Sequence, residues 1–318
     1  MTVPPSLRTK LNTASVLIAE GRLEAAEDAL REIAQTDPGT ALGPLTAMGM
    51  PRRLQSAWLK LAKARGDEDR KFALQYRLIP PEEQILSIFT ENAFSRSKYV
   101  AAQDAPIPRT LHQIWVGGPP PETTKAWAAE AGAWGWDYRL WDEAALERIG
   151  VTEDSAWRHM RHRDDLPGAV DVARYHLLAH SGGVYLDCDW MPVPGAPLSA
   201  ALPARGLSAI AEATPRRTGT GSPFLNNSVI ATPPDHPVFR QLIAHLPEVI
   251  RRLPKGPAWW VTGPLVFTLA ARMGPMTILD ARLSSPPLTG DRSSVDAALQ
   301  RLADEGSPPV LAPWKPWG

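Results

Sequence analysis

One stretch of the sequence, residues 171–189, constrains the fold more than any other part of the chain. Asp171 and Arg174 lie three residues apart, so they share one face of a predicted helix, which Gly182-Gly183 brings to an end. The apolar residues 184–186 follow as a short, β-prone segment of the kind that forms an interior strand. The order of helix, glycine stop and buried strand predicts an α/β fold.

Two carboxylates, Asp187 and Asp189, come directly after this predicted strand. Ligands bind at the carboxyl ends of strands in open α/β sheets, so both acids are expected at the binding edge. Two carboxylates 4 Å apart repel by roughly 4 kcal/mol at an effective dielectric near 20, and a divalent cation removes this repulsion. Oxygen ligands suit Mn²⁺ or Mg²⁺, and an ion held by so few carboxylates completes its shell with water and substrate phosphates. The pair therefore predicts a metal site for a nucleotide diphosphate; the alternative is two solvated loop acids.

The block from Asp171 to Asp189 resembles the DXD sugar-binding region of a family of glycosyltransferases. Residues 107–118 are similar to the opening strand of that family, and residues 226–231 resemble a third, weaker block. The family includes bacterial polysaccharide and lipopolysaccharide transferases and the Golgi initiating mannosyltransferase, with the clostridial glucosylating toxins as more distant relatives. The resemblance covers roughly residues 105–275 and implies a Rossmann-like catalytic domain of the GT-A type, which binds a nucleotide sugar.

The resemblance also implies roles for individual residues. The catalytic set that it implies is Asp171, Arg174, Asp187 and Asp189, of which Asp187 and Asp189 are the metal ligands. The donor-binding set is Ile114, Trp115, Asp171, Arg174, Tyr185, Asp187, and Asn226 or Asn227. Within it, Trp115 matches the residue that stacks on the nucleotide base, and Trp314 or Trp317 is a candidate to close over the donor. No residue matches a catalytic base, which stays unassigned.

These residue types suit sugar transfer from a nucleotide diphosphate. A metal ion neutralises the charge that develops on the leaving diphosphate, and Arg174 can clamp a phosphate through two hydrogen bonds. The resulting prediction is a metal-dependent, retaining transfer of a hexose from a UDP- or GDP-sugar to a saccharide, lipid-linked saccharide or protein acceptor. Two alternatives remain: a metal-dependent phosphohydrolase, and a helical-repeat binding protein whose sugar-transferase domain has lost its activity.

Composition narrows the class of protein. The chain has 318 residues, enough for about two domains, and its 34 basic residues balance 34 acidic ones, so no global field favours nucleic acid. Its single cysteine fits a reducing compartment. The amino terminus lacks a secretion signal, and no run approaches the ~20 apolar residues that cross a bilayer. We expect a cytoplasmic location, with peripheral contact to the inner face of a membrane as an alternative.

The first hundred residues differ in kind from the rest. Apolar residues recur at helical spacing, and the segment around Gly21 resembles a tetratricopeptide-type helical hairpin. Between Arg52 and Arg77 the chain carries eight basic and three acidic residues, which form either a solvated helix face or a platform for an anionic acceptor, a membrane or a protein partner. The predicted organisation is a helical domain, a linker, a catalytic domain and a proline-rich tail, at residues 1–95, 96–106, 107–283 and 284–318.

Within the catalytic domain, the sequence predicts strands at 109–116 and 137–141, and a helix capped by Asp142. Later helices are predicted to begin near His236 and Pro264.

Overall fold

The structure is a computed structural model. It describes residues 6–36, 38–45, 50–76, 82–91, 93–212, 222–254, 256–306 and 309–314, apart from the side chains at 68, 72, 75 and 76. These residues form two compact units, one that takes in residues 6–76 and another from Glu82 onward. None of the helices in the described ranges combines the length and apolar character that a membrane-spanning helix requires.

The smaller unit is entirely helical. Its helices are α1 (Leu7–Ala19), α2 (Leu23–Gln35), α3 (Arg52–Arg65) and α4 (Glu68–Tyr76). The Ser6 hydroxyl accepts a hydrogen bond from the Thr9 N–H and caps α1, and Gly66 ends α3 with a left-handed φ of 67°. Buried residues at helical spacing, such as Leu30 and Leu54, form its core. The described part is therefore helical, as the apolar spacing predicts, and the tetratricopeptide-type hairpin stays a prediction.

The larger unit is built on a mixed six-stranded sheet of order β2-β1-β3-β6-β5-β7. Neighbouring strands are parallel except that β6 runs antiparallel to both β3 and β5. The strands are β1 (Thr110–Ile114), β2 (Asp137–Trp141), β3 (Gly183–Leu186), β5 (Ser208–Ala211), β6 (Leu225–Thr232) and β7 (Thr277–Leu279). A separate antiparallel pair joins β4 (Trp190–Pro192) to β8 (Leu311–Pro313). This mostly parallel sheet confirms the predicted α/β class and fits the GT-A type of fold.

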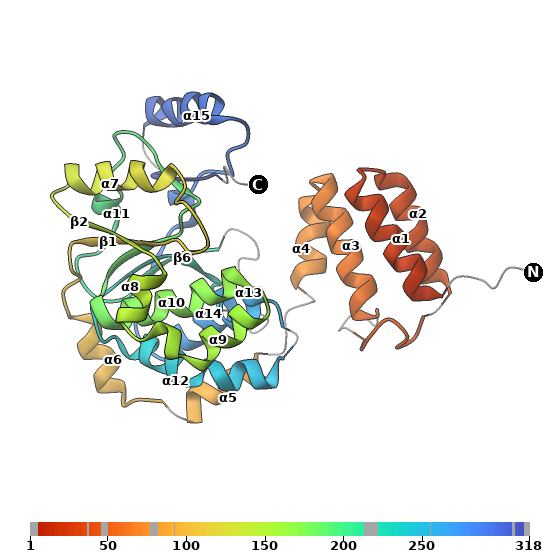
Figure 1. Cartoon of the computed structure of the whole chain (residues 1–318), viewed down its shortest axis with the longest axis horizontal. Helices are drawn as coiled ribbons and strands as arrows, with labels where there is room; N and C mark the ends of the chain where they lie inside the picture. Colours follow the sequence, from red (N-terminus) through yellow and green to blue (C-terminus); the bar gives the residue numbers. More distant parts are fainter. Residues whose placement is uncertain are drawn as a thin grey trace, which may run out of the picture. The chain divides into compact units, whose positions relative to one another are not determined.

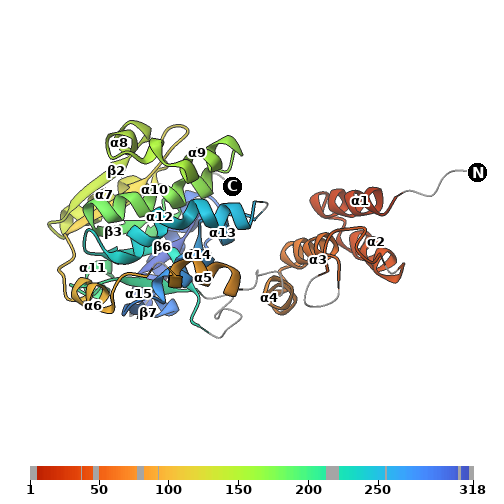
Figure 2. The ribbon, with the colours of Figure 1, turned by 90° about the horizontal axis from the view of Figure 1, so that it is seen from below.

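Helices cover both faces of the sheet, as Figure 1 shows. The longest helices are α10 (Leu166–Ser181) and α12 (Pro237–Arg252), which lie side by side in the view from below (Figure 2). The remaining helices are α5 (Glu83–Glu91), α6 (Arg96–Gln103), α7 (Thr123–Ala133), α8 (Glu143–Arg148), α9 (Ser155–His162), α11 (Leu198–Ala201), α13 (Ala258–Val261), α14 (Pro264–Ala271) and α15 (Arg292–Glu305), with short 3-10 turns at Val151–Glu153 and Ala281–Leu283.

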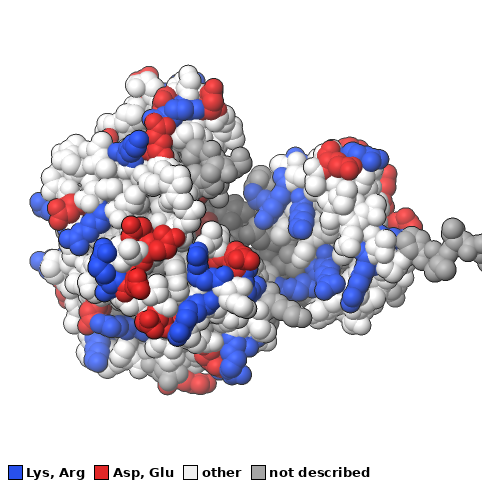
Figure 3. Space-filling model, in the orientation of Figure 1, with Lys and Arg blue, Asp and Glu red and all other residues white. Residues whose placement is uncertain are grey.

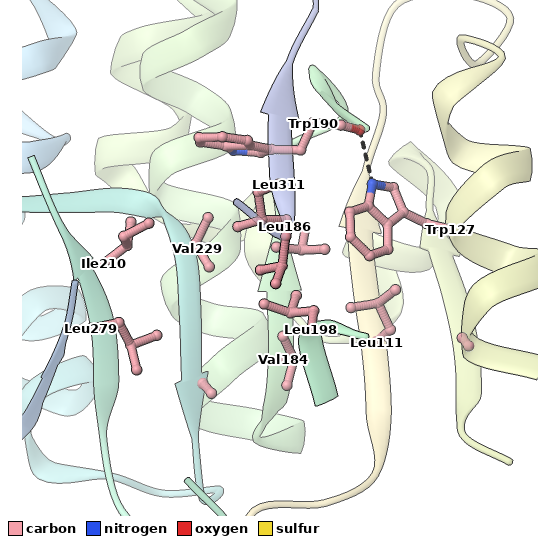
Figure 4. Close-up of a cluster of buried hydrophobic side chains, with 13 residues drawn as sticks. Leu111, Trp127, Val184, Leu186, Trp190, Leu198, Ile210, Val229, Leu279 and Leu311 are labelled. Carbon is pink, nitrogen blue, oxygen red and sulfur yellow. Dashed lines mark hydrogen bonds between the residues drawn. The ribbon is translucent and has the colours of Figure 1, made fainter. Parts of the chain in front are cut away.

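The core between the sheet and α7 follows from strand alternation. Val184 and Leu186 on β3 point to this face together with Leu111 on β1 and Val229 on β6 (Figure 4). Strand alternation puts Tyr185, between the two β3 residues, on the opposite face. Trp127 of α7 closes the cluster, and its indole N–H donates to the carbonyl of Trp190 over 2.8 Å. Fully buried strands of this kind fix the position of the loop that follows β3.

Several predicted elements form as expected. The β2 strand spans Asp137–Trp141, and the Asp142 carboxylate caps α8 by accepting from the Ala145 N–H. The His236 ring accepts from the Val238 N–H and caps α12, and α14 begins at Pro264.

Three other segments have a structure that the sequence does not predict. Where the sequence predicts a linker over 96–106, α6 forms, because Tyr99 is buried to 1 % exposure in a place that the missing Cβ of Gly274 leaves open. Helix α5, assigned by the sequence to the helical domain, likewise belongs to the larger unit. The predicted tail from 284 contains α15 and β8.

Candidate functional site

The topology of the sheet brings four chain segments to one edge. Since β3, β5 and β7 run in the same direction, their carboxyl ends share an edge, and the antiparallel β6 begins there. A pocket of about 1310 Å³ opens at this edge. The predicted site residues that line it are Asp171, Arg174, Asp187, Asp189, Asn226 and Asn227.

Helix α10 presents Asp171 and Arg174 to the pocket because both ends of the helix are fixed. The Asp165 carboxylate caps its first turn by accepting from the Gly168 N–H, and Gly182 ends it with a φ of 59°. A Cβ at Gly182 would lie 2.4 Å from the nitrogen of Pro234, so only glycine fits there. The predicted Gly-Gly stop is therefore also a close approach between two backbones.

The Arg174 guanidinium links three elements. One of its terminal nitrogens (Nη2) lies 3.1 Å from Asp171 Oδ1 and 3.0 Å from Asp187 Oδ1, and the other (Nη1) donates to the carbonyl of Asn227 over 2.5 Å. The guanidinium carbon sits 4.7 Å from the centre of the Tyr185 ring. Burial opposes the charged form, yet Asp187, Tyr185 and Asp171 raise the pKa of Arg174 overall, so this side chain stays cationic.

Asp171 is held in place on every side. Its Oδ1 accepts from the Asn227 amide over 2.8 Å, and its Oδ2 accepts from the Thr262 hydroxyl over 3.0 Å. Burial raises the pKa of Asp171 to about 6, while the Arg174 charge and the two hydrogen bonds act in the opposite direction. The Tyr175 hydroxyl accepts from the Asn227 amide and donates to the Thr262 carbonyl, so it completes the support.

The two acids after β3 stand in different surroundings. Asp187 Oδ1 accepts from the Tyr185 hydroxyl over 2.6 Å, and the Asp187 N–H donates to the Ser228 carbonyl over 2.9 Å. The carbonyl of Asp189 accepts from the Trp314 N–H over 2.7 Å. The strand pair β4–β8 thus braces the loop that carries both acids, an arrangement that the sequence does not reveal.

The donor set suits a hard divalent cation, since Asp187 and Asp189 offer carboxylate oxygens at the pocket wall. Across the described ranges, no group of three or more His, Cys, Asp or Glu side chains is placed to hold a metal. A cation at the two acids would therefore take further ligands from water and substrate phosphates.

Three predicted donor-binding residues do not line the pocket in the described part of the chain: Ile114, Trp115 and Tyr185. The Ile114 carbonyl accepts from the Cys188 thiol, and the Trp115 N–H donates to the Trp141 carbonyl over 2.9 Å. Tyr185 is fully buried and acts on the site through Asp187 and Arg174. Their contact with a donor stays a prediction.

Asn226 and Asn227 are distinguished by their partners. The amide of Asn227 is committed to Asp171 and Tyr175 at 4 % exposure, so this side chain positions others. The Asn226 side chain is half-buried and lines the pocket, and its Oδ1 accepts from the Ser228 N–H. Of the two, Asn226 is the better placed to meet a ligand.

The far wall of the pocket contains residues that the sequence analysis misses. Glu212 directly follows β5, and burial raises the pKa of its carboxyl to about 7. Trp259 lines the pocket and stacks on Phe224, with ring centres 5.0 Å apart and planes 9° apart. Asp280 and Arg282, which form an ion pair, follow β7. None belongs to a local motif, and only the strand order brings them to the site.

Comparisons with known proteins match the segment of the chain that contains α10 and β3. Residues 133–200 match the family model described as "Glycosyltransferase sugar-binding region containing DXD motif", a segment that includes α10, β3, Asp187 and Asp189. The chain therefore carries a sugar-binding DXD domain of the glycosyltransferase type, which confirms the predicted class of enzyme.

A solved structure titled "PaToxG Glycosyltransferase" superposes with a TM-score of 0.43 at 17% sequence identity, over 70% of this chain and 84% of that chain. The comparison with curated proteins found no match.

Proposed function

We propose that the protein is a metal-dependent, retaining glycosyltransferase that moves a hexose from a UDP- or GDP-sugar to a hydroxyl group of a saccharide or protein. The supporting observation is the charge of the pocket. Its wall carries five carboxylates and two guanidinium groups, from Asp171, Asp187, Asp189, Glu212, Asp280, Arg174 and Arg282.

This balance makes a metal ion necessary for a nucleotide diphosphate to bind. Asp280 pairs with Arg282, and Arg174 compensates only one of its two carboxylate neighbours, Asp171 and Asp187. The excess negative charge repels a diphosphate and attracts a divalent cation. Asp187 and Asp189 would hold Mn²⁺ or Mg²⁺, which when bound neutralises the charge on the leaving diphosphate.

Other side chains then have defined tasks. Arg174 keeps Asp187 in position and offers fixed positive charge at the pocket wall, and Asn226 and Asp171 present polar atoms to the hydroxyl groups of the donor sugar. The exposed face of Trp259 is a flat apolar surface that suits the apolar face of a sugar ring.

Glu212 is our candidate for the group that holds the acceptor hydroxyl and takes its proton. It follows β5, and Asp187 follows β3, with β6 between them, so two strand spacings of about 5 Å each separate their backbones across the sheet, and they are also offset along β6, where Asp187 lies beside Ser228 and Glu212 beside Phe224. This separation leaves room for a sugar ring. A carboxyl with a pKa near 7 can accept a proton at neutral pH while the bond from the anomeric carbon to the diphosphate breaks.

Thermal unfolding with a panel of nucleotide sugars tests the proposal. With Mn²⁺, the correct donor at 100 times its Kd should stabilise the protein by about 2.7 kcal/mol, which raises the Tm by roughly 5–10 °C. With EDTA, the shift should vanish. With Mn²⁺ present, the protein should also hydrolyse the same donor slowly and release the nucleoside diphosphate.

Asp189→Asn tests the metal site, because it removes a charge with little change in shape. This variant should lose both the metal-dependent shift and turnover. The matched control is Asp235→Asn, an exposed acid just after β6 at the opposite edge of the sheet, where a φ of 57° also suits Asn. A donor shift that persists in EDTA, or in Asp189→Asn, would refute the proposal.

A further inference from the structure

A second hollow lies within the helical unit, between α1 and α3. It has a volume of about 490 Å³, within the size range of small-ligand sites. Its polar lining comes chiefly from Arg8, Asn12, Arg52, Arg53, Ser56 and Lys60. Figure 3 shows Lys and Arg side chains over the α1 and α3 side of this unit, and the acidic side chains in view lie nearer its margins.

Helical spacing explains why these side chains converge. Arg53, Ser56 and Lys60 are separated by three and four residues and so form one stripe along α3. Arg8 and Asn12 form a matching stripe on α1. Two further lining residues, Leu11 and Ala57, are buried and form an apolar floor between the stripes. The short side chains of Ser56 and Ala57 leave the space of the hollow unfilled.

The charges in the hollow are unbalanced. Four cationic side chains line it, those of Arg8, Arg52, Arg53 and Lys60, and no acidic side chain from the described residues does. Among the residues that the structure describes, no carboxylate lies within 4.0 Å of the charged nitrogens of Arg8, Arg53 or Lys60.

Other basic side chains of the same unit form ion pairs with carboxylates. Arg31, Arg65 and Arg70 all bind Glu27, where the hydrogen bond from Arg65 lowers the pKa of the carboxyl to about 2, and Lys10 binds Glu32. Arg8, Arg53 and Lys60 are thus left for a partner outside the unit.

We infer that this hollow is a binding site for a phosphate-bearing ligand, held by Arg8, Arg53 and Lys60. Arginine binds phosphate through two parallel hydrogen bonds, and a lysine on the adjacent turn adds a point charge. The site lies wholly within the helical unit and shares no lining residue with the sugar-transfer pocket. A soluble phosphate compound and a phospholipid head group present the same chemical group to it.

Calorimetry with inorganic pyrophosphate, on the full chain in EDTA, tests the site without the metal-dependent pocket. Binding should weaken about tenfold in Lys60→Gln and further in the double variant Arg53→Gln/Lys60→Gln. Lys63→Gln is the matched control, because Lys63 is an exposed lysine of α3 that does not line the hollow. Circular dichroism establishes that the variants fold.

Co-sedimentation with vesicles identifies the source of the phosphate group. Binding to phosphatidylglycerol vesicles, but not to phosphatidylcholine vesicles, that is lost in Lys60→Gln supports the site and assigns it to a lipid head group. Pyrophosphate binding alone supports the site and assigns it to a soluble ligand. The inference is overturned if neither probe binds, or if Lys63→Gln weakens binding as much as Lys60→Gln does.

Discussion

Replacement of Arg174 by lysine separates the charge of this side chain from its geometry. Arg174 is only 3 % exposed and makes three contacts, with Asp171, Asp187 and the Asn227 carbonyl. A lysine keeps the charge, but its single nitrogen cannot replace two terminal nitrogens that face different elements. A lysine nitrogen can take the place of Nη2 between the two carboxylates or of Nη1 at the carbonyl, so the variant loses one or two of the three contacts. Each hydrogen bond to a charged group contributes about 1.5–3 kcal/mol, so Arg174→Lys should cost about 1.5–6 kcal/mol.

The cost should depend on pH. Burial raises the pKa of Asp171 to about 6, above the value near 3.9 of an unfolded chain, so its ionised form is disfavoured in the folded protein. Stability linked to Asp171 is fully present below that unfolded value and is lost as the pH rises through about 6. The close contact of the Arg174 charge with Asp171 opposes this loss, so a lysine that holds its charge farther from Asp171 should destabilise the protein more at pH 8 than at pH 5.

Thermal unfolding followed by tryptophan fluorescence measures both effects. All tryptophans except Trp58 lie after residue 82, so the signal reports mainly on the α/β unit. The expected fall in Tm is about 10 °C at pH 8 and smaller at pH 5. Arg251→Lys is the control, because Arg251 pairs with Glu248 on the surface and should tolerate the change. A fall below about 3 °C, or equal falls at both pH values, would refute this account of the site.

Three further changes test other parts of the structure. Gly182→Ala puts a Cβ 2.4 Å from the nitrogen of Pro234, so we expect little folded protein by size-exclusion chromatography and circular dichroism. Glu212→Gln should lower the rate of sugar transfer at least tenfold while donor hydrolysis persists, and should abolish the fall in wild-type transfer rate below pH ~7; an unchanged pH profile would contradict the role of Glu212. Trp314→Ala removes a buried ring beside the backbone that holds the Asp189 carbonyl; it should cost about 3–5 kcal/mol and weaken Mn²⁺ binding in a titration.

The part of the site on α10 and β3 could be predicted because its signals are local. The spacing of Asp171 and Arg174 puts both on one helix face, and Gly182 marks the end of that helix within the same short stretch. Asp187 lines the pocket because it directly follows a strand that is buried on both faces. The position of the Trp115 ring could not be predicted in this way. A strand pattern predicts that the Trp115 backbone follows β1 at this edge of the sheet, but it does not predict where the ring lies.

Helix α6 could not be predicted for a different reason. Small and polar residues around Tyr99 read as a linker, and only the space beside Gly274, far away in sequence, makes burial of the Tyr99 ring possible. Trp317, one of two candidates to close over a donor, lies outside the described residues. The other, Trp314, packs against α15, and its indole N–H donates to the Gly290 carbonyl. These contacts hold the backbone that bonds to the Asp189 carbonyl in place.

The acceptor side of the pocket depends on topology in a way that no local pattern can express. Glu212 follows a strand of four residues, and the acids after β3 come more than twenty residues earlier in the chain. Glu212 and these acids reach the same edge of the sheet because β6 runs antiparallel between β3 and β5. The two parallel strands therefore end at one edge with a single strand between them. That spacing separates the charged diphosphate end of the pocket from the carboxylate proposed for the acceptor. The strand order, together with the register along β6, therefore sets the separation between these two ends of the pocket.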